Sequence, residues 1–271
     1  MLSYITWSVD PAITEIFGRE IRWYGLLWAC AIFVAWEIVK RIFKNEKCPE
    51  EWGDKLFIYG VLGLVLGARL GHCLFYGADN DFFYYYKNPL KILKIWEGGL
   101  SSHGGAFGLL IAMWLYNKYV IKKGYIWIFD RLVVGVAIGG ALIRFGNLLN
   151  SEIFGGPTTL PWGFEFIRSP EWQRIGLPCH PTQIYEIIYC LITFAVCMWL
   201  YWKKEAYRKR GLIFGIFLIG IFLSRFLLEF IKNNQETFEE NMLLNMGQIL
   251  SIPFIIAGII LIYRALIPEK K

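Results

Sequence analysis

An apolar block that ends in polar residues reads Trp127-Ile-Phe-Asp-Arg-Leu-Val-Val-Gly-Val-Ala-Ile-Gly-Gly-Ala-Leu-Ile-Arg-Phe-Gly-Asn-Leu-Leu-Asn-Ser-Glu152. Its apolar part has the length that a membrane-spanning helix needs, about 20 residues. The helix then runs into four polar side chains, Arg144, Asn147, Asn150 and Glu152. An arginine at membrane depth costs about 2.5–3.5 kcal/mol on insertion scales, so a chain that keeps one usually provides it with a partner or a ligand.

Arg144 begins a polar stripe along this helix. Residues three apart share a helix face, so Arg144, Asn147 and Asn150 line up. One guanidinium and two amides make a donor-rich surface that suits a phosphate or a carboxylate. The stripe therefore favours a membrane enzyme, or a transporter, that acts on an anionic molecule. The structural alternative is a helix end at the interface with Arg144 extended toward the headgroups.

The composition is that of a membrane protein. Of the 271 residues, 56% are hydrophobic and 18% are charged, whereas a soluble domain carries about 25% charged residues. The apolar residues fall into seven blocks of spanning length: Tyr24–Ile42, Lys55–Tyr76, Ser102–Val120, Trp127–Leu148, Ile184–Trp202, Gly211–Ile231 and Gly247–Ile267. These blocks predict an all-α polytopic membrane protein with seven transmembrane helices in a single domain, 1–271.

The distribution of basic residues predicts the orientation. Lysines and arginines cluster after the first, third, fifth and seventh blocks, and the other loops are longer and less basic. The positive-inside rule then places the N-terminus outside and the C-terminus in the cytoplasm. On the outer side we expect an interfacial segment (1–22), an arm (77–99) and a small cap (151–182). The net charge of +6 reflects this bias and not a nucleic-acid-binding surface.

A histidine flanked by glycines, in Ser102-His103-Gly104-Gly105, stands where the outer arm meets the third block. Glycines allow close backbone approach, and a helix N-terminus offers free N–H groups to an anion. Histidine is the side chain best suited to proton transfer near neutral pH, so His103 is a candidate for taking a proton from a thiol or hydroxyl. The structural alternative is an interfacial histidine bonded to a carbonyl, with the glycines serving helix packing.

A carboxylate enters the fifth block in His180-Pro-Thr-Gln-Ile-Tyr-Glu186. Glu186 lies about one turn into the span, where an unpaired carboxylate is costly. We therefore expect it to pair with an arginine elsewhere in the bundle. Thr182 or His180 is expected to cap the start of this helix.

Two further cations lie inside predicted spans. Arg225 and Glu229 are four residues apart and can bridge along one helix face. A second buried arginine facing Arg144 predicts a two-pronged phosphate site, and an internal ion pair is the structural alternative. Arg69, between two glycines of the second block, is the third intramembrane cation.

Taken together, these motifs resemble the bacterial phosphatidylglycerol–prolipoprotein diacylglyceryl transferases over nearly the whole chain and in the same order. The pieces that carry the resemblance are Trp23-Tyr24-Gly25, Gly67-Ala-Arg69-Leu-Gly71, Trp96-Glu-Gly-Gly99, His103-Gly-Gly105, Arg144-Phe-Gly-Asn147-Leu-Leu-Asn150-Ser-Glu152, His180-Pro-Thr-Gln-Ile-Tyr-Glu186, Arg225-Phe-Leu-Leu-Glu229-Phe230 and Met246-Gly-Gln-Ile-Leu-Ser251. Each piece is modest alone, and together they are specific.

The resemblance implies a reaction and a location. Such an enzyme transfers the diacylglyceryl group of phosphatidylglycerol to the lipobox cysteine thiol of a preprolipoprotein, the first step of bacterial lipoprotein maturation. A thioether forms and glycerol phosphate leaves. The implied location is the bacterial cytoplasmic (inner) membrane, as a multi-pass protein with its active site toward the outer leaflet.

The resemblance also implies roles for individual residues. Arg144 and Arg225 would be the essential cations, with His103 and Tyr24 near the reacting groups. The other residues expected to bind phosphatidylglycerol are Asn147, Asn150, Glu152, Gly104 and Gly105. The expected supporting residues are Arg69, Glu186 and Glu229.

Three positions depart from the family pattern. Ile221 stands where a tyrosine is usual, four residues before Arg225. His72 replaces a tyrosine that often follows Arg-Leu-Gly. The stretch after Glu229-Phe230 reads Ile-Lys232-Asn-Asn-Gln, where an Arg-x-Pro-Asp/Glu run is common. These departures touch supporting positions and leave both candidate arginines in place.

The chemistry agrees with the residues. The leaving phosphate must be stabilised as charge builds, which buried arginines do strongly in a dry site. The thiol must become a thiolate, with His103 the candidate base and a phosphate oxygen or Glu152 the alternatives. No metal or cofactor is expected. An anionic-lipid or small-anion transporter is the main competing function; an intramembrane protease and a structural scaffold explain the polar residues less well.

Overall fold

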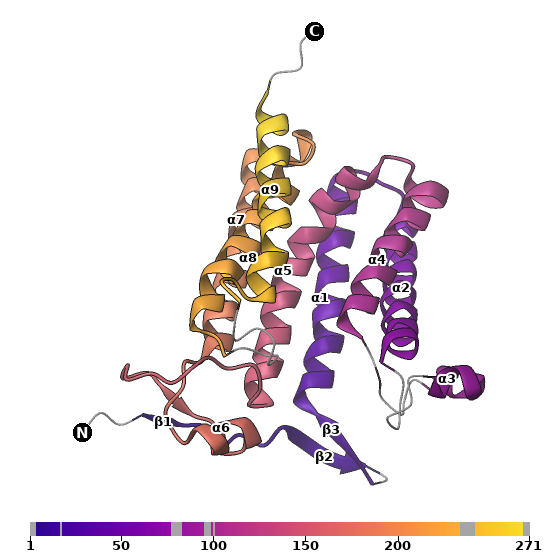
Figure 1. Cartoon of the computed structure of the whole chain (residues 1–271). Helices are drawn as coiled ribbons and strands as arrows, with labels where there is room; N and C mark the ends of the chain where they lie inside the picture. The colour runs from indigo at the N-terminus through magenta and orange to yellow at the C-terminus, as the bar shows by residue number, and fades with distance from the viewer. Residues whose placement is uncertain are drawn as a thin grey trace. The chain divides into compact units, whose positions relative to one another are not determined.

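The computed structural model of the chain describes residues 4–16, 18–76, 83–94, 99, 101–233 and 242–267. Over these residues the chain is mostly helical, and it divides into two compact units. Unit 1 comprises Met1–Val39 and Phe129–Lys271, and unit 2 comprises Lys40–Ile128. Figure 1 shows the helices and strands that make up the two units.

Long helices form the body of unit 1, because its sequence is apolar over whole spanning lengths. Helices α1 and α5 each extend from unit 1 into unit 2, and α7, α8 and α9 lie wholly in unit 1. Their bounds are Trp23–Asn45 (α1), Tyr125–Leu149 (α5), Thr182–Lys204 (α7), Leu212–Leu228 (α8) and Met246–Leu266 (α9). Two 3-10 turns accompany them, η4 (Ala206–Arg208) and η5 (Glu229–Ile231).

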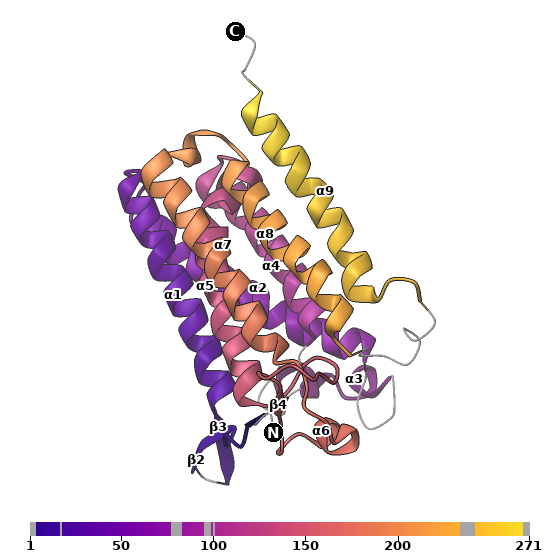
Figure 2. The same ribbon diagram turned by 90° about the vertical axis from the view of Figure 1, so that its left-hand side faces the viewer.

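Small residues let these helices approach closely. A Cβ atom at Gly135 of α5 would lie only 2.7 Å from the Ala35 carbonyl oxygen of α1. A Cβ atom at Gly215 of α8 would lie 2.9 Å from the Gly258 carbonyl oxygen of α9, and α9 runs beside α8 in Figure 2. Such close backbone contact is the usual way in which helices pack inside a membrane.

Five of the seven predicted spans are confirmed as helices long and apolar enough to cross a membrane. Within the described ranges these are Glu51–Phe75, Tyr125–Leu149, Thr182–Lys204, Leu212–Ile231 and Met246–Leu266. The first and third predicted spans are helical too. The third is α4 (Ser102–Tyr116), which continues as the π-turn η3 (Asn117–Ile121).

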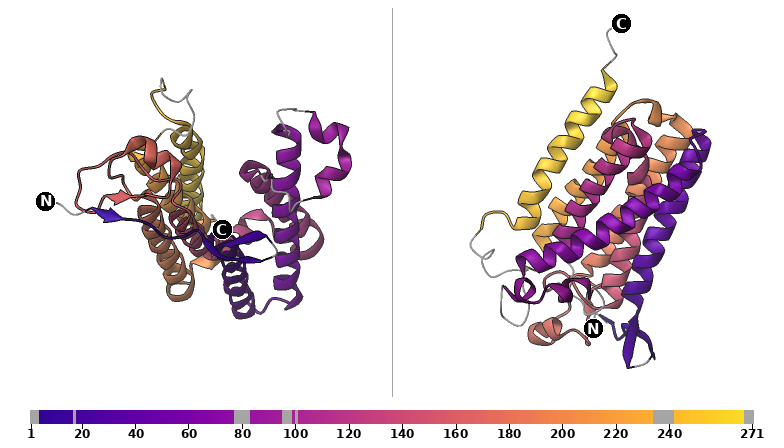
Figure 3. Two further views of the ribbon diagram at one scale, coloured as in Figure 1. Left: turned by 90° about the horizontal axis from the view of Figure 1, so that it is seen from below. Right: turned by 90° about the vertical axis from the view of Figure 1, so that its right-hand side faces the viewer.

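Unit 2 is built on the pair α2 (Glu51–Phe75) and α4. Glycines of both helices face one another: a Cβ atom at Gly67 would lie 2.4 Å from the Gly104 carbonyl oxygen. The predicted outer arm contains α3 (Tyr84–Lys87) and the 3-10 helix η1 (Pro89–Leu93), seen beside α2 in Figure 3. Its residues 77–82 and 95–98 lie outside the described part of the chain.

The predicted cap is a small folded layer in unit 1. Strand β4 (Phe164–Glu165) pairs in parallel with β1 (Ile5–Thr6) of the N-terminal segment, and α6 (Pro170–Ile175) follows it. The core of this layer is formed by Leu148, Phe154, Phe164, Phe166 and Cys179, with Trp7, Trp172, Ile175 and Ile184 packed against it. The cap therefore holds the end of α5, close to Arg144.

The N-terminal segment, expected to lie at the interface, is more ordered than its alternating sequence indicates. After β1 it forms an antiparallel hairpin of β2 (Ala12–Ile16) and β3 (Arg19–Arg22), which leads into α1. The Trp7 indole Nε1 donates to the Leu148 carbonyl oxygen at 3.0 Å. This bond ties the segment to the end of α5.

Candidate active site

Arg144 reaches from the last turns of α5 to the first turns of α7. Its Nε lies 3.0 Å from Glu186 Oε2, and the Glu186 side chain is fully buried. Its Nη1 donates to Asn147 Oδ1 at 3.2 Å. The expectation that Glu186 pairs with an arginine is confirmed, and the partner is the arginine of the polar stripe itself.

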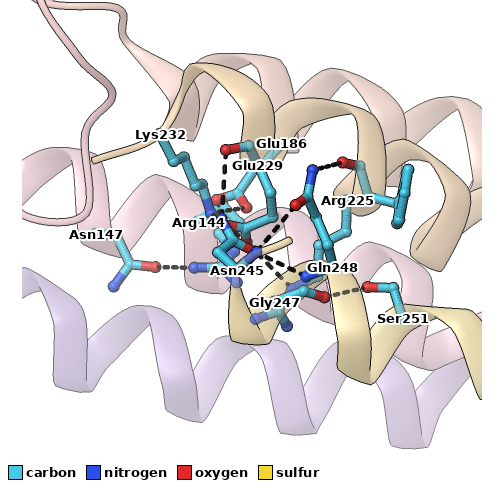
Figure 4. Close-up of polar contacts among 11 residues, drawn as sticks. Arg144, Asn147, Glu186, Arg225, Glu229, Lys232, Asn245, Gly247, Gln248 and Ser251 are labelled. Atoms are coloured by element: carbon cyan, nitrogen blue, oxygen red, sulfur yellow. Dashed lines mark hydrogen bonds and ion pairs between the residues drawn. The ribbon is translucent and has the colours of Figure 1, made fainter. Parts of the chain in front are cut away.

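A lysine joins this pair to the second arginine. Lys232 Nζ lies 2.8 Å from Glu186 Oε1 and 3.6 Å from Glu229 Oε1. Glu229 Oε1 in turn lies 3.5 Å from Arg225 Nε, which confirms the expected bridge along one helix face. We call these five residues the ion-pair network. Figure 4 shows their side chains gathered from α5, α7, α8, η5 and the segment after it.

At the two ends of the network, Arg144–Glu186 and Arg225–Glu229, the contacts are ion pairs without well-aligned hydrogen bonds. Glu186 Oε2 and Arg225 Nε are buried and have no well-aligned hydrogen-bond partner in the described part of the chain, although each faces an opposite charge. The Lys232–Glu186 contact in the middle is a short hydrogen bond of 2.8 Å. Lys232 thus makes the shortest of the ion-pair contacts described for the network.

The start of α9 supports Glu229. Asn245 Nδ2 donates to Glu229 Oε2 at 3.2 Å, while the Asn245 and Gln248 side chains close a capping box on the helix. A Cβ atom at Gly247 would lie 2.6 Å from Glu229 Oε1. The glycine is required there because the carboxylate occupies the space of a side chain.

Three of these supporting residues were missed from the sequence: Lys232, Asn245 and Gln248. A signal existed for each. Lys232 lies three residues after Glu229, the spacing of neighbours on a helix. Asn245 and Gln248 have the spacing of a capping box before an apolar run.

Glu152 accepts hydrogen bonds from both amides of the polar stripe. Its Oε1 accepts from Asn147 Nδ2 at 2.7 Å and from Asn150 Nδ2 at 3.3 Å. Its backbone carbonyl accepts from Gln183 Nε2 of α7 at 2.7 Å. The stripe is therefore connected to the ion-pair network through Asn147 and to α7 through Gln183.

The turn that carries Glu152 has unusual backbone conformations. Ser151 and Ile153 have φ values of 55° and 59°, a region that a β-branched residue rarely adopts. Thr182 Oγ1 donates to the Ile153 carbonyl oxygen at 3.0 Å. The prediction that Thr182 or His180 caps α7 is wrong, since the N-cap is Pro181 without a side-chain bond; Thr182 holds the Glu152 turn instead.

Tyr24 lies beside the polar stripe. A Cβ atom at Gly146 would come within 2.8 Å of Tyr24 Cδ2. The first turn of α1 thus packs on α5 two residues beyond Arg144. A larger residue at position 146 would displace the tyrosine ring.

Three predicted site residues, His103, Gly104 and Gly105, lie at the start of α4 in unit 2. His103 is exposed in the first turn of α4. Gly104 packs on α2, and its N–H donates to the N-cap Ser101 Oγ at 3.2 Å. Gly105 is buried and faces Leu64 of α2. In the structure these glycines thus serve helix packing.

Arg69 is almost fully buried, with 3% of its surface exposed. It donates to the carbonyl oxygens of Lys91, Ile92 and Gly99 at 2.6, 2.9 and 3.2 Å. Its guanidinium therefore holds the backbone of the outer arm.

Two titratable groups of the cap are shifted by burial. Burial raises the pKa of the Cys179 thiol to about 11, so it is a poor nucleophile near neutral pH. Burial lowers the pKa of His180 below its ordinary value of 6.5. The described residues contain no group of three or more His, Cys, Asp or Glu side chains placed to hold a metal ion.

Comparison with known proteins identifies the family. A sequence model described as "Prolipoprotein diacylglyceryl transferase" matches residues 11–264. The chain belongs to this family. The diacylglyceryl transferase family thus accounts for nearly the whole chain, including both units.

Relatives in this family are similar along their full length. A protein of Porphyromonas gingivalis is 53% identical over 97% of this chain and 95% of its own. Proteins of Chloroherpeton thalassium and Bacteroides fragilis are 41% and 42% identical, over 97% and 96% of this chain and 95% and 94% of their own. All three are named phosphatidylglycerol–prolipoprotein diacylglyceryl transferase. The chain is accordingly a membrane-embedded transferase of the diacylglyceryl transferase family.

Proposed function

We propose that the ion-pair network binds the phosphate of phosphatidylglycerol while the chain transfers its diacylglyceryl group to the lipobox cysteine thiol of a preprolipoprotein. The bond between the glyceryl carbon C3 and the phosphate oxygen breaks, and a carbon–sulfur bond forms. Glycerol phosphate leaves, and the thiol proton passes to a base. Family membership supports the reaction, and the joined arginines support the role of the network.

The charges of the network favour an anion. Arg144, Lys232 and Arg225 carry three positive charges, and Glu186 and Glu229 carry two negative ones. One net positive charge matches the single negative charge of a phosphodiester. Because the site is largely buried, that attraction is stronger than it is in bulk water.

Side-chain exposure separates the groups that can meet a ligand from those that support them. Arg144 and Arg225 are 23% and 38% exposed, whereas the Lys232, Glu186 and Glu229 side chains are 4%, 0% and 8% exposed. The two arginine side chains are therefore the accessible part of the network, and the other three side chains form its buried part. This is the single observation that carries the proposal.

The arginines then act on the transition state. As the carbon–oxygen bond breaks, negative charge builds on the leaving phosphate, and preorganised guanidinium groups stabilise it without having to reorient. Asn147, already bonded to Arg144, and Glu152 complete the site beside the glycerol headgroup. Asn150 holds Glu152 and so belongs to the same group.

The thiol is activated by a base, for which His103 is our candidate. Its exposed position at the start of α4 leaves the imidazole accessible to a substrate, and an imidazole can take a proton from a thiol. A phosphate oxygen or Glu152 is the alternative base. Tyr24 is proposed to lie near the reacting groups because it packs next to Arg144 on Gly146.

In the membrane, we propose seven spans with the N-terminus outside and the C-terminus in the bacterial cytoplasm. Helix α1 has 23 residues, enough to span at about 1.5 Å per residue. Residues 102–121 of α4 and η3 have a similar length. The network then lies toward the outer leaflet, where the phosphatidylglycerol headgroup and the translocated preprolipoprotein meet.

The test uses purified protein with phosphatidylglycerol and a lipobox peptide in detergent or vesicles. We expect release of glycerol phosphate and a matching mass increase of the peptide at its cysteine. A peptide whose cysteine is replaced by serine is the control. Absence of both products from the wild-type protein, or movement of the lipid between leaflets without chemistry, would overturn the transferase proposal.

A further inference from the structure

At the end of α5 opposite to Arg144, the carboxylate of Asp130 accepts hydrogen bonds from the start of another helix, α8. Asp130 is fully buried. Its Oδ2 accepts from the Gly211 N–H at 2.7 Å, and its Oδ1 accepts from the Phe214 N–H at 2.9 Å. Both donors belong to the start of α8, the helix that carries Arg225.

Helix α8 cannot cap itself. Its N-cap residue is Gly211, with φ of 90° and no side chain to accept a hydrogen bond. In a capping box two side chains of the same helix satisfy the N-cap and third-residue N–H groups. Here Asp130 satisfies both of them from α5, so the cap is also a link between two helices.

Ring stacking reinforces the same link. Phe129, which precedes Asp130, stacks on Phe214, whose N–H donates to Asp130; the ring centroids lie 4.9 Å apart with an angle of 18° between the planes. Two hydrogen bonds and one ring contact therefore fix where α8 begins along α5.

The sequence distances from this link to the two arginines are equal. Arg144 lies 14 positions after Asp130, and Arg225 lies 14 positions after Gly211. At about 1.5 Å per helical residue, each arginine lies about 21 Å along its helix from the link. Because α5 and α8 run in the same direction, aligning their starts brings both arginines to the same level.

We propose that Asp130 is a positioning residue for the transfer reaction: by capping α8 from α5, it sets the axial register that brings Arg225 level with Arg144. The proposal rests on the proposed function of the ion-pair network. Asp130 touches no reacting group, and it acts only through the placement of the two arginines.

The rate test compares Asp130→Ala and the milder Asp130→Asn with the wild type, per folded enzyme. Misplacement of about 1 Å at a catalytic site can lower a rate about 100-fold. We expect a loss of that size in kcat for Asp130→Ala and a smaller one for Asp130→Asn, with KM for phosphatidylglycerol changed less. Asp54→Asn, which removes an exposed carboxylate of α2, is the matched control and keeps the wild-type rate.

A distance measurement reports the axial register of α8 relative to α5 directly. Nitroxide labels are placed by Phe145→Cys and Leu227→Cys, both exposed positions, after Cys30 and Cys48 are replaced; the other four cysteines are buried. We expect Asp130→Asn to shift or broaden the label distance by at least one residue rise, about 1.5 Å. This variant keeps one acceptor and so serves if Asp130→Ala does not fold.

Two results would overturn the proposal: a normal kcat in a folded Asp130 variant, or a lowered kcat with an unchanged label distance. Neither is confused with failure of the proposed function. That failure appears as a wild-type protein that releases no glycerol phosphate, whatever the label distance shows.

Discussion

Lys232 and Glu186 form a hydrogen-bonded ion pair of 2.8 Å in which neither side chain is more than 4% exposed. The lysine stands where the family pattern leads one to expect an arginine motif, and it connects the partners of Arg144 and Arg225. The two arginines are thus parts of one charged assembly. The proposed phosphate site depends on that assembly acting as a unit.

Removing the lysine tests this dependence. Lys232→Met leaves two buried carboxylates facing each other without their shared cation. Breaking a buried ion pair by removing one partner costs about 3–5 kcal/mol, and we expect a loss of that order in the free energy of unfolding, with transfer activity lost as well. Thermal unfolding in detergent measures the loss of stability, and the peptide assay measures the loss of transfer activity.

Two companion variants make the test specific. Lys232→Arg keeps the charge and is expected to retain most of the stability. Glu186→Gln in the Lys232→Met background removes one of the two carboxylates that shared the lysine and is expected to restore part of the stability. A stable, active Lys232→Met protein would show that the network does not depend on its central cation.

Gly247 tests the position of Glu229. Gly247→Ala places a methyl group within 2.6 Å of the carboxylate, which is held by Arg225, Lys232 and Asn245 and has to move. We expect a rate about tenfold lower, since small displacements at a reacting site are costly. Gly60→Ala is the matched control, because nothing lies within 4 Å of a Cβ atom there; a similar rate loss in both would remove the steric explanation.

His103→Gln tests the proposed base. If the imidazole accepts the thiol proton, its removal is expected to slow the reaction by about 10²–10⁴-fold at neutral pH. The difference in rate between the wild type and the variant should shrink at higher pH, where the thiol ionises by itself. Rates of the wild type and the variant across pH measure both effects. A near-normal rate at neutral pH would assign the proton to a phosphate oxygen or Glu152.

Stability should fall in mild acid through His180. Burial lowers the pKa of this group below 6.5 in the folded protein, so folding favours the neutral imidazole. Its contribution is fully present above pH 6.5 and is lost as the pH falls toward the folded-state pKa, because only the unfolded chain takes up the proton. We expect thermal unfolding to show a smaller acid loss in His180→Gln than in the wild type. Equal losses would exclude His180 as a source.

The spans were predictable because each depends on one property of a contiguous segment. The block 127–148 was predicted from its apolar length, and α5 covers Tyr125–Leu149. The same argument gave helices close to the observed bounds for the other blocks. Strand β1 was not predicted, because it is defined by pairing with β4, which lies more than 150 residues away.

The part of the site that could be predicted is the part in which a buried charge needs a partner of opposite sign. Glu186 was expected to pair with an arginine because an unpaired carboxylate in a span is costly, and Arg144 is that partner. The sequence did not reveal that Lys232 completes the assembly, since the residue follows the sixth span and reads as an ordinary flanking lysine. Its contact with Glu186 joins positions 46 residues apart in the chain, which local spacing does not encode.

The most direct test of the central claim compares Arg144→Ala and Arg225→Ala with the wild type, both for retention of phosphatidylglycerol in native mass spectrometry and for glycerol phosphate release. If both guanidinium groups hold the same lipid phosphate, each folded variant loses the preference for phosphatidylglycerol over diacylglycerol, and turnover falls at least about 100-fold. Undiminished preference and turnover in either folded variant would contradict a shared phosphate site.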